Sequence, residues 1–126
     1  MKSSRKPVSF IATDNPEKAR VFFSDVLGLK LLENSAFALV FADGEHVLRV
    51  QIVPELFPAS YTAHGWQVTN ISTEVERLIS KGVLFLRFDQ LPQDNLGIWT
   101  SPDGHKIAWF NDPSENVLSL TQHNDK

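Results

Sequence analysis

Hydrophobic residues follow a helical spacing early in the chain. Between Glu17 and Leu27 the apolar positions recur at i, i+3, i+4, i+7 and i+8, which places them on one face of a helix. Asn15 suits the N-cap of this helix, Pro16 its first position, and Gly28 a left-handed stop. The pattern predicts an amphipathic helix that packs on an apolar surface.

Strand-like runs surround this helix and predict a first module, residues 7–53. Adjacent runs are separated by Asn34-Ser35 and by Asp43-Gly44, and Asp-Gly is a strong hairpin signal. The expected strands are Pro7 to Thr13 before the helix, then Leu29 to Glu33, Phe37 to Ala42 and Glu45 to Val53. The predicted order is therefore β-α-β-β-β.

Residues 54–60 contain two prolines and no periodicity, so we expect a linker there. A second module, residues 61–122, begins with an expected strand from Tyr61 to Asn70. Thr73 and Glu76 have the spacing of a capping box, which predicts that a second helix opens there and ends at Gly82. Its expected inward residues are Val75, Leu78 and Ile79.

The remaining runs repeat the first module. The expected strands are Val83 to Phe88, Gly97 to Thr100, Lys106 to Phe110 and Val117 to Thr121. The segment Val40-Phe41-Ala42-Asp43 matches Trp109-Phe110-Asn111-Asp112, a repeat of about 70 residues that is too long for a solenoid unit and typical of paired half-domains. The predicted fold class is α+β, with two βαβββ modules, the second of which has one short extra strand or extended segment.

Composition narrows the functional classes. A chain of 126 residues, 42% hydrophobic and 21% charged, is typical of one globular domain or two small modules sharing a core. With 12 basic and 15 acidic residues it lacks the electrostatic signature of nucleic-acid binding. The absence of cysteine excludes disulfides, thiolate metal sites and cysteine nucleophiles. Since no signal sequence or membrane span is present, we expect a cytoplasmic protein without membrane or nucleic-acid partners.

Two segments resemble the vicinal oxygen chelate superfamily, which includes glyoxalase I, bleomycin-resistance proteins and extradiol dioxygenases. They are NPEKARVFFSDVLGL, from Asn15 to Leu29, and WFNDPSENVLSLTQ, from Trp109 to Gln122. The chain is also similar to a bacterial branch, largely of unassigned function, with the hallmarks GWQV, QDNLGIWTSPDG and AWFNDP. The resemblance implies two βαβββ units whose curved mixed sheets form a ligand-holding cup, often within a homodimer.

The resemblance also implies a divalent metal held by one side chain from the first and last strands of each module, which polarises two substrate oxygens. By position these four slots fall at Pro7 or Val8, at Arg49, at Ala63 with His64 beside it, and at Ser119. No clear ligand set is present there. His64 is a weak metal candidate, because a single imidazole is a poor site and strand alternation turns it away from the face of Ala63. We therefore expect no metal and no other cofactor.

Arg49 and Gln51 are candidate ligand-binding residues. They share one face of the expected strand while Leu48, Val50 and Ile52 share the other. If the first face lines the cup, the forked guanidinium of Arg49 can hold a carboxylate or phosphate ester. The alternative is an outward arginine that is paired on the surface.

The second module carries the remaining candidates. Trp99 and Trp109 can stack on a planar ligand, whereas we expect Trp66 and Phe110 to pack against the helices. Asp94 lies in a polar loop that is either a cavity rim or a turn. Ser119 keeps its strand face polar, or is a half-buried strand hydroxyl.

Three functions stay open. The predicted one is binding of a small aromatic or anionic molecule in the cup, without a recognisable metal-ligand set, as in drug-sequestering relatives. The alternative is a divalent-metal-dependent lyase, isomerase or dioxygenase with His64 and Asp94, or Glu55, in its site. The third is a structural subunit that acts only through dimerisation.

Overall fold

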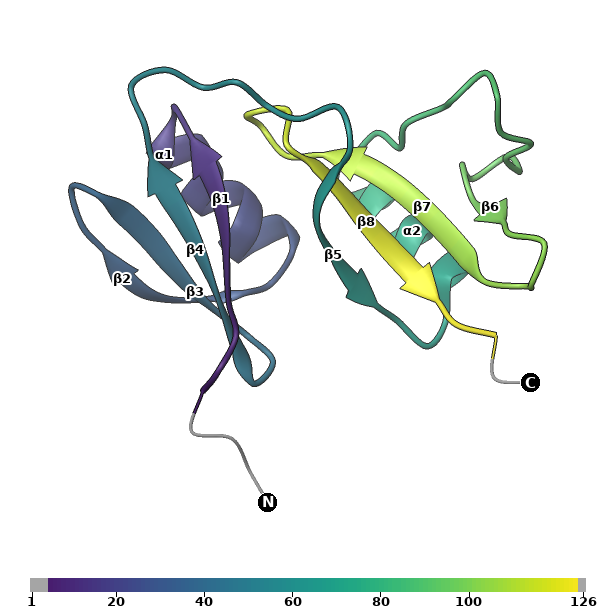
Figure 1. Ribbon diagram of the computed structural model, residues 1–126, viewed down its shortest axis with the longest axis horizontal. Helices are drawn as coiled ribbons and strands as arrows, with labels where there is room; N and C mark the ends of the chain where they lie inside the picture. Colours follow the sequence, from purple (N-terminus) through teal and green to yellow (C-terminus); the bar gives the residue numbers. More distant parts are fainter. Residues whose placement is uncertain (1–4, 125–126) are drawn as a thin grey trace. The chain divides into compact units, whose positions relative to one another are not determined.

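Each half of the chain folds as a four-stranded mixed sheet with a helix against one face (Figure 1). The computed structural model describes residues 5–124. The chain divides between Pro58 and Ala59 into two compact units, and each has the element order βαβββ. The predicted α+β class is confirmed. No helix among residues 5–124 is long and apolar enough to cross a membrane.

The sheet of the first unit has the strand order β1-β4-β3-β2. Its strands are β1 (Val8–Thr13), β2 (Lys30–Asn34), β3 (Ala38–Asp43) and β4 (His46–Ile52). β1 runs parallel to β4, and the other neighbours are antiparallel. The parallel pair requires a crossover, which the helix and the β2–β3 hairpin supply.

The first helix begins where the sequence predicts. The Asn15 side chain accepts a hydrogen bond from the backbone N–H of Lys18 at 3.2 Å, and α1 (Pro16–Val21) starts directly after it. The helix then widens into the π-helical turn η1 (Phe22–Val26), which ends before Gly28 at a φ of 78°. Glycine adopts this left-handed conformation without a steric penalty.

One face of the first sheet is buried under this helix. The largest of the buried side chains are Phe23, Leu39, Phe41, Leu48 and Val50, each no more than 1% exposed. The rings of Phe23 and Phe41 lie 5.5 Å apart. Arg49 and Gln51 therefore point to the opposite face, as alternation along β4 predicts.

The second unit repeats this arrangement with the strand order β5-β8-β7-β6. Its elements are β5 (Thr62–Gln67), α2 (Ile71–Ser80), β6 (Trp99–Thr100), β7 (Lys106–Asn111) and β8 (Val117–Gln122). The buried residues Val75 and Leu78 of α2 and Phe110 and Leu118 of the sheet form its core.

The capping-box prediction is wrong, because α2 begins two residues earlier than Thr73. Asn70 is the N-cap, and its side chain accepts a hydrogen bond from the backbone N–H of Thr73 at 3.1 Å. The N–H of Ile71 is satisfied from outside the helix by the side-chain oxygen of Gln122, at 2.8 Å. This frame buries Ile71 and leaves Ile79 44% exposed, contrary to the prediction.

The predicted strand Val83 to Phe88 is also wrong. Phe85 forms only an isolated bridge to Phe110, and the segment continues as irregular chain. The side chain of Gln93 replaces a strand partner: it accepts from the N–H of Phe88 at 2.7 Å and donates to the carbonyl of Leu86 at 2.9 Å. A side chain that satisfies the backbone locally removes the need for a ladder.

Candidate functional site

The sheet face of the second unit that points away from α2 is built around Trp109. In the strand register Trp109 lies beside Ser119 of β8, and Ser119 lies beside Gly65 of β5. A Cβ atom at Gly65 would lie 2.3 Å from the Ser119 Oγ, so any side chain at this position would require the hydroxyl to move. The row thus combines one large ring with one small polar group.

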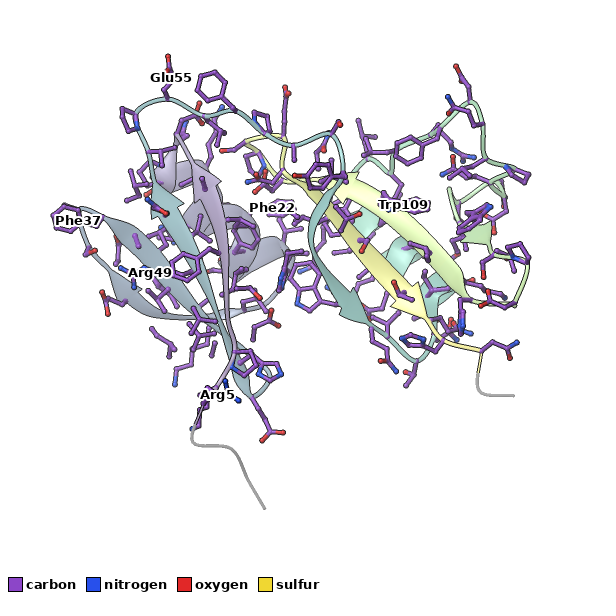
Figure 2. The ribbon with its side chains drawn as sticks, viewed as in Figure 1. Arg5, Phe22, Phe37, Arg49, Glu55 and Trp109 are labelled. Atoms are coloured by element: carbon purple, nitrogen blue, oxygen red, sulfur yellow. The ribbon has the colours of Figure 1, made fainter. Side chains whose placement is uncertain are left out.

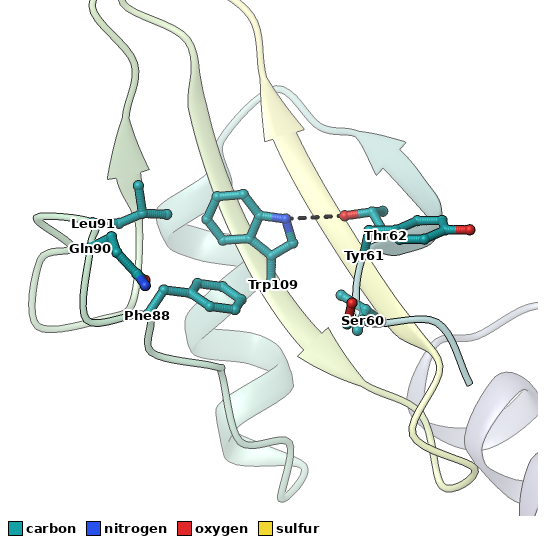
Figure 3. A pocket seen from close by; sticks show the side chains of 8 residues that line it. Ser60, Tyr61, Thr62, Phe88, Gln90, Leu91 and Trp109 are labelled. Atoms are coloured by element: carbon teal, nitrogen blue, oxygen red, sulfur yellow. Dashed lines mark hydrogen bonds between the residues drawn. The ribbon is translucent and has the colours of Figure 1, made fainter. Parts of the chain in front are cut away.

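A hydrogen bond fixes the Trp109 ring across the sheet. Its indole N–H donates to the Thr62 Oγ1 at 3.1 Å, which joins β7 to β5 over the intervening β8 (Figure 3). Thr62 can face Trp109 because the β5 register shifts between Thr62 and His64. Without this bulge, alternation would turn Thr62 to the helix side.

Two further rings support Trp109. Phe88 meets it edge to face, with the ring centres 5.3 Å apart and the planes at 90°. Trp99 of β6 lies 6.2 Å from it in a tilted arrangement. Both geometries are favourable for aromatic pairs, so the indole is held in one orientation.

A pocket of about 340 Å³ opens beside this cluster, entirely within the second unit (Figure 3). Its lining residues are Ser60, Tyr61, Thr62, Phe88, Gln90, Leu91, Trp109 and Val117. The volume is in the range of small-molecule sites. Because the lining combines aromatic and aliphatic groups with neutral polar ones, the pocket suits an uncharged, flat molecule.

Of the residues predicted from sequence in this unit, Trp109 alone lines the pocket. Trp99 contacts it only through Trp109, and Ser119 is a buried neighbour on the same sheet face. The Asp94 Oδ1 accepts from the backbone N–H groups of Leu96 and Ile98, both at 2.9 Å. Asp94 thus shapes its own loop, which corresponds to the turn alternative.

Arg49, labelled in Figure 2, lies in the first unit on the face of β4 opposite the helix. Gln51 shares this face by strand alternation. Arg49 is half-buried and Gln51 is exposed. The residue of β1 that pairs with Arg49 is Phe10, two positions beyond the expected slot at Val8. Their role in ligand binding stays a prediction.

The residues at the expected metal positions do not fit a divalent ion. The two rows contain Phe10 beside Arg49, and Gly65 rather than Ala63 beside Ser119. Within either described unit, no three His, Asp or Glu side chains come together in a group that could hold a metal. A site for a transition metal needs several such donors.

His64 belongs to the other side of the second sheet. It pairs with Leu118, a core residue of the helix-covered face, and its ring meets that of Trp66 edge to face at 4.8 Å. Trp66 pairs with Leu120 and shares this face.

The pocket includes residues that the sequence reasoning missed. The orientation of Thr62 could not be predicted, because strand periodicity does not indicate the bulge beside it. Phe88 and Leu91 lie in a segment predicted as a strand followed by a turn. A usable signal was the polar run Gln93-Asp94-Asn95, which indicates a structured loop, and such loops commonly carry binding residues.

Two exposed carboxylates have shifted pKa values. The hydrogen bond from Arg20, helped by its charge, lowers the pKa of Glu17, and the hydrogen bond from the Ser101 hydroxyl lowers the pKa of Asp103. Neither residue lines the pocket. A lowered pKa also makes each carboxylate a weaker base, so neither is a candidate general base.

Comparison with known proteins identifies the fold. No protein-family model and no curated protein sequence matches the chain. Solved structures match it over nearly its whole length. A glyoxalase/bleomycin resistance protein/dioxygenase from Alicyclobacillus acidocaldarius has a TM-score of 0.74 at 17% identity, covering 99% of this chain and 96% of that one.

Two other similar structures carry more specific names. Lactoylglutathione lyase from Agrobacterium tumefaciens has a TM-score of 0.74 at 14% identity, covering 97% of this chain and 96% of that one. TnmS3, an antibiotic binding protein from Streptomyces sp. CB03234, has a TM-score of 0.72 at 23% identity, covering 98% and 99%. At these identities the likeness establishes the fold and leaves activity open.

Proposed function

Since the chain has the glyoxalase/bleomycin resistance protein/dioxygenase fold, we propose that it binds a small, uncharged aromatic molecule in the pocket beside Trp109. The observation that carries this proposal is the fixed indole on the wall of an otherwise mostly apolar pocket. The antibiotic-binding function named for TnmS3 is consistent with it.

The pocket residues offer a ligand two kinds of contact, aromatic stacking and hydrogen bonding. Trp109 and Phe88 provide flat apolar surfaces on which a ring can stack. Thr62 accepts the indole N–H through its oxygen and keeps its own hydroxyl proton as a donor. A ligand with a hydrogen-bond acceptor at its edge can therefore meet both the ring and this hydroxyl.

Binding of 2-naphthol, a planar and neutral probe at pH 7, tests the proposal. We expect the variant Trp109→Ala to weaken binding at least about tenfold, because it removes the stacking surface. Thr62→Val should weaken it about fivefold, because the valine keeps the shape but loses a hydrogen bond of about 1 kcal/mol. Isothermal titration calorimetry measures both changes.

Trp66→Phe is the matched control, since Trp66 lies on the face that α2 covers. This variant should bind 2-naphthol as the wild type does. Equal affinity in wild type and Trp109→Ala would contradict the proposal. Equal losses in all three variants would show a general effect on folding rather than a pocket.

The metal-dependent alternative makes a separate prediction. Because no three His, Asp or Glu side chains of residues 5–124 form a group that could hold a metal, we expect little bound metal. Protein purified without a chelator or affinity tag should contain far less than one divalent ion per chain, by elemental mass spectrometry. Added Zn²⁺, Mn²⁺ or Ni²⁺ should not raise its melting temperature. A stoichiometric metal that stabilises the fold would instead support the lyase, isomerase or dioxygenase function. Homodimer formation and a cytoplasmic location stay predictions.

A further inference from the structure

The first unit has an arginine that lacks a counterion. Arg20 pairs with Glu17 at 2.6 Å, Arg77 pairs with Glu74 at 3.1 Å, and Arg87 donates to the carbonyl of Asn95 at 2.7 Å. Within residues 5–124, no hydrogen bond or ion pair joins the Arg49 side chain to another residue. Arg49 is nevertheless half-buried, so part of its side chain lies against neighbouring residues.

The surroundings of Arg49 on this sheet face are apolar. Across the strands, the row through Arg49 reads Phe10, Arg49, Val40 and Glu33. Along β1 the same face carries Val8, which is 48% exposed, and Phe10, which is 59% exposed. The unpaired Arg49 side chain, labelled in Figure 2, is therefore flanked by exposed apolar side chains of β1.

The one acidic residue of this row limits what the arginine can bind. Glu33 lies two strands from Arg49, which is about 10 Å between backbones at the usual strand spacing. At that separation Glu33 does not pair with the guanidinium. Its carboxylate would still repel a second negative charge of a ligand on that side of Arg49. The apolar surface with Val8 and Phe10 lies on the other side of Arg49.

We propose that this face binds the carboxylate of a small organic monoacid. Arg49 holds the two carboxylate oxygens with its fork of N–H donors, and the apolar body of the acid lies on Phe10 and Val8. The charge pair forms beside apolar groups, where water screens it less than at an open surface. Gln51, two residues along the same strand face, can donate to an additional acceptor.

This site uses no residue of the Trp109 pocket, so it does not rest on the function proposed above. Either proposal can fail while the other holds. The two sites also differ in ligand chemistry. The Trp109 pocket has no charged lining residue, whereas the guanidinium of Arg49 favours a negatively charged ligand.

The test uses phenylacetate as the probe and phenylacetamide as its neutral counterpart. Titration of the full chain at pH 7 is followed through the arginine Nε–Hε signals in a ¹H–¹⁵N spectrum, with the Arg49 signal assigned from the variant Arg49→Gln. We expect phenylacetate to shift the Arg49 signal and to leave the Arg77 signal in place. Phenylacetamide should bind at least about tenfold more weakly, because it cannot form the charged pair.

Variants separate the charge from the apolar surface. Arg49→Gln should reduce phenylacetate affinity at least about tenfold, while Arg77→Gln, the same change of charge on α2, should leave it unchanged. Phe10→Ala should weaken phenylacetate and phenylacetamide by similar factors. Arg49→Lys should retain part of the affinity, because it keeps the charge but loses the fork.

Three outcomes would overturn the proposal. The first is equal binding of the acid and the amide. The second is an Arg49 signal that does not respond to phenylacetate. The third is an Arg49→Gln variant that sediments differently from the wild type, together with no change in the Arg49 signal of the wild type on adding phenylacetate. That result would identify the face as a contact between copies of the chain.

Discussion

Replacing Asp112 by alanine should lower the free energy of unfolding by about 3 kcal/mol. Asp112 is 5% exposed, and one carboxylate oxygen accepts from the backbone N–H groups of Ser114 and Asn116, both at 2.9 Å. The other oxygen accepts from the Asn116 side-chain amide at 2.8 Å. Alanine removes the carboxylate that accepts from these buried donors, and losing a buried acceptor costs more than the hydrogen bonds contribute net.

Urea denaturation followed by circular dichroism measures this loss. Asp112→Asn is the matched control. Its amide oxygen still accepts from the two backbone N–H groups, while its NH₂ group replaces the oxygen that accepts from the Asn116 side chain. It should therefore lose less stability than Asp112→Ala. A loss below about 1 kcal/mol for the alanine variant would show that water replaces the carboxylate and that the turn does not depend on it.

Replacing Gly65 by alanine should destabilise the protein by about 2 kcal/mol. The new Cβ would lie 2.3 Å from the Ser119 Oγ and 3.0 Å from the Ser119 carbonyl oxygen. The hydroxyl must move aside within a buried site, and the carbonyl belongs to β8 and moves only with the strand. The strain therefore falls on the pairing of β5 with β8, which also positions Thr62 opposite Trp109.

A double-mutant cycle with Ser119→Ala isolates this contact. The second change removes the Oγ and should restore part of the stability lost in Gly65→Ala, whereas Ser119→Ala alone should have a small effect. Strictly additive losses would mean that the hydroxyl is not the source of the strain. Thermal unfolding of the four proteins at one pH provides the comparison.

Local chemistry explains why most of the elements could be predicted from the sequence. Asn15, Pro16 and Gly28 mark the ends of the first helix through capping and backbone preferences that need no partner. Asp43-Gly44 marks a hairpin for the same reason. The strand predicted from Val83 to Phe88 was wrong because an apolar run there is equally suited to irregular chain. Hydrogen bonds with the Gln93 side chain hold this irregular chain, and they arise only on folding.

The candidate site could be predicted only in part. Trp109 was identified from its type and strand position, and it does line the pocket. Asp94 was a candidate because of its chemistry, yet its carboxylate serves the loop backbone. Side-chain type indicates what a residue can do, whereas hydrogen-bond partners decide what it does.

The sequence by itself determined the repeated βαβββ order and the fold class, because both follow from periodicity and turn chemistry. The tertiary structure alone decided which side chains share a surface. Thr62 and Trp109 are 47 residues apart, and they meet because one bulge in β5 reverses the alternation of the strand before His64. Such a register shift depends on pairing with β8, and pairing between distant segments leaves no periodic signal in the chain.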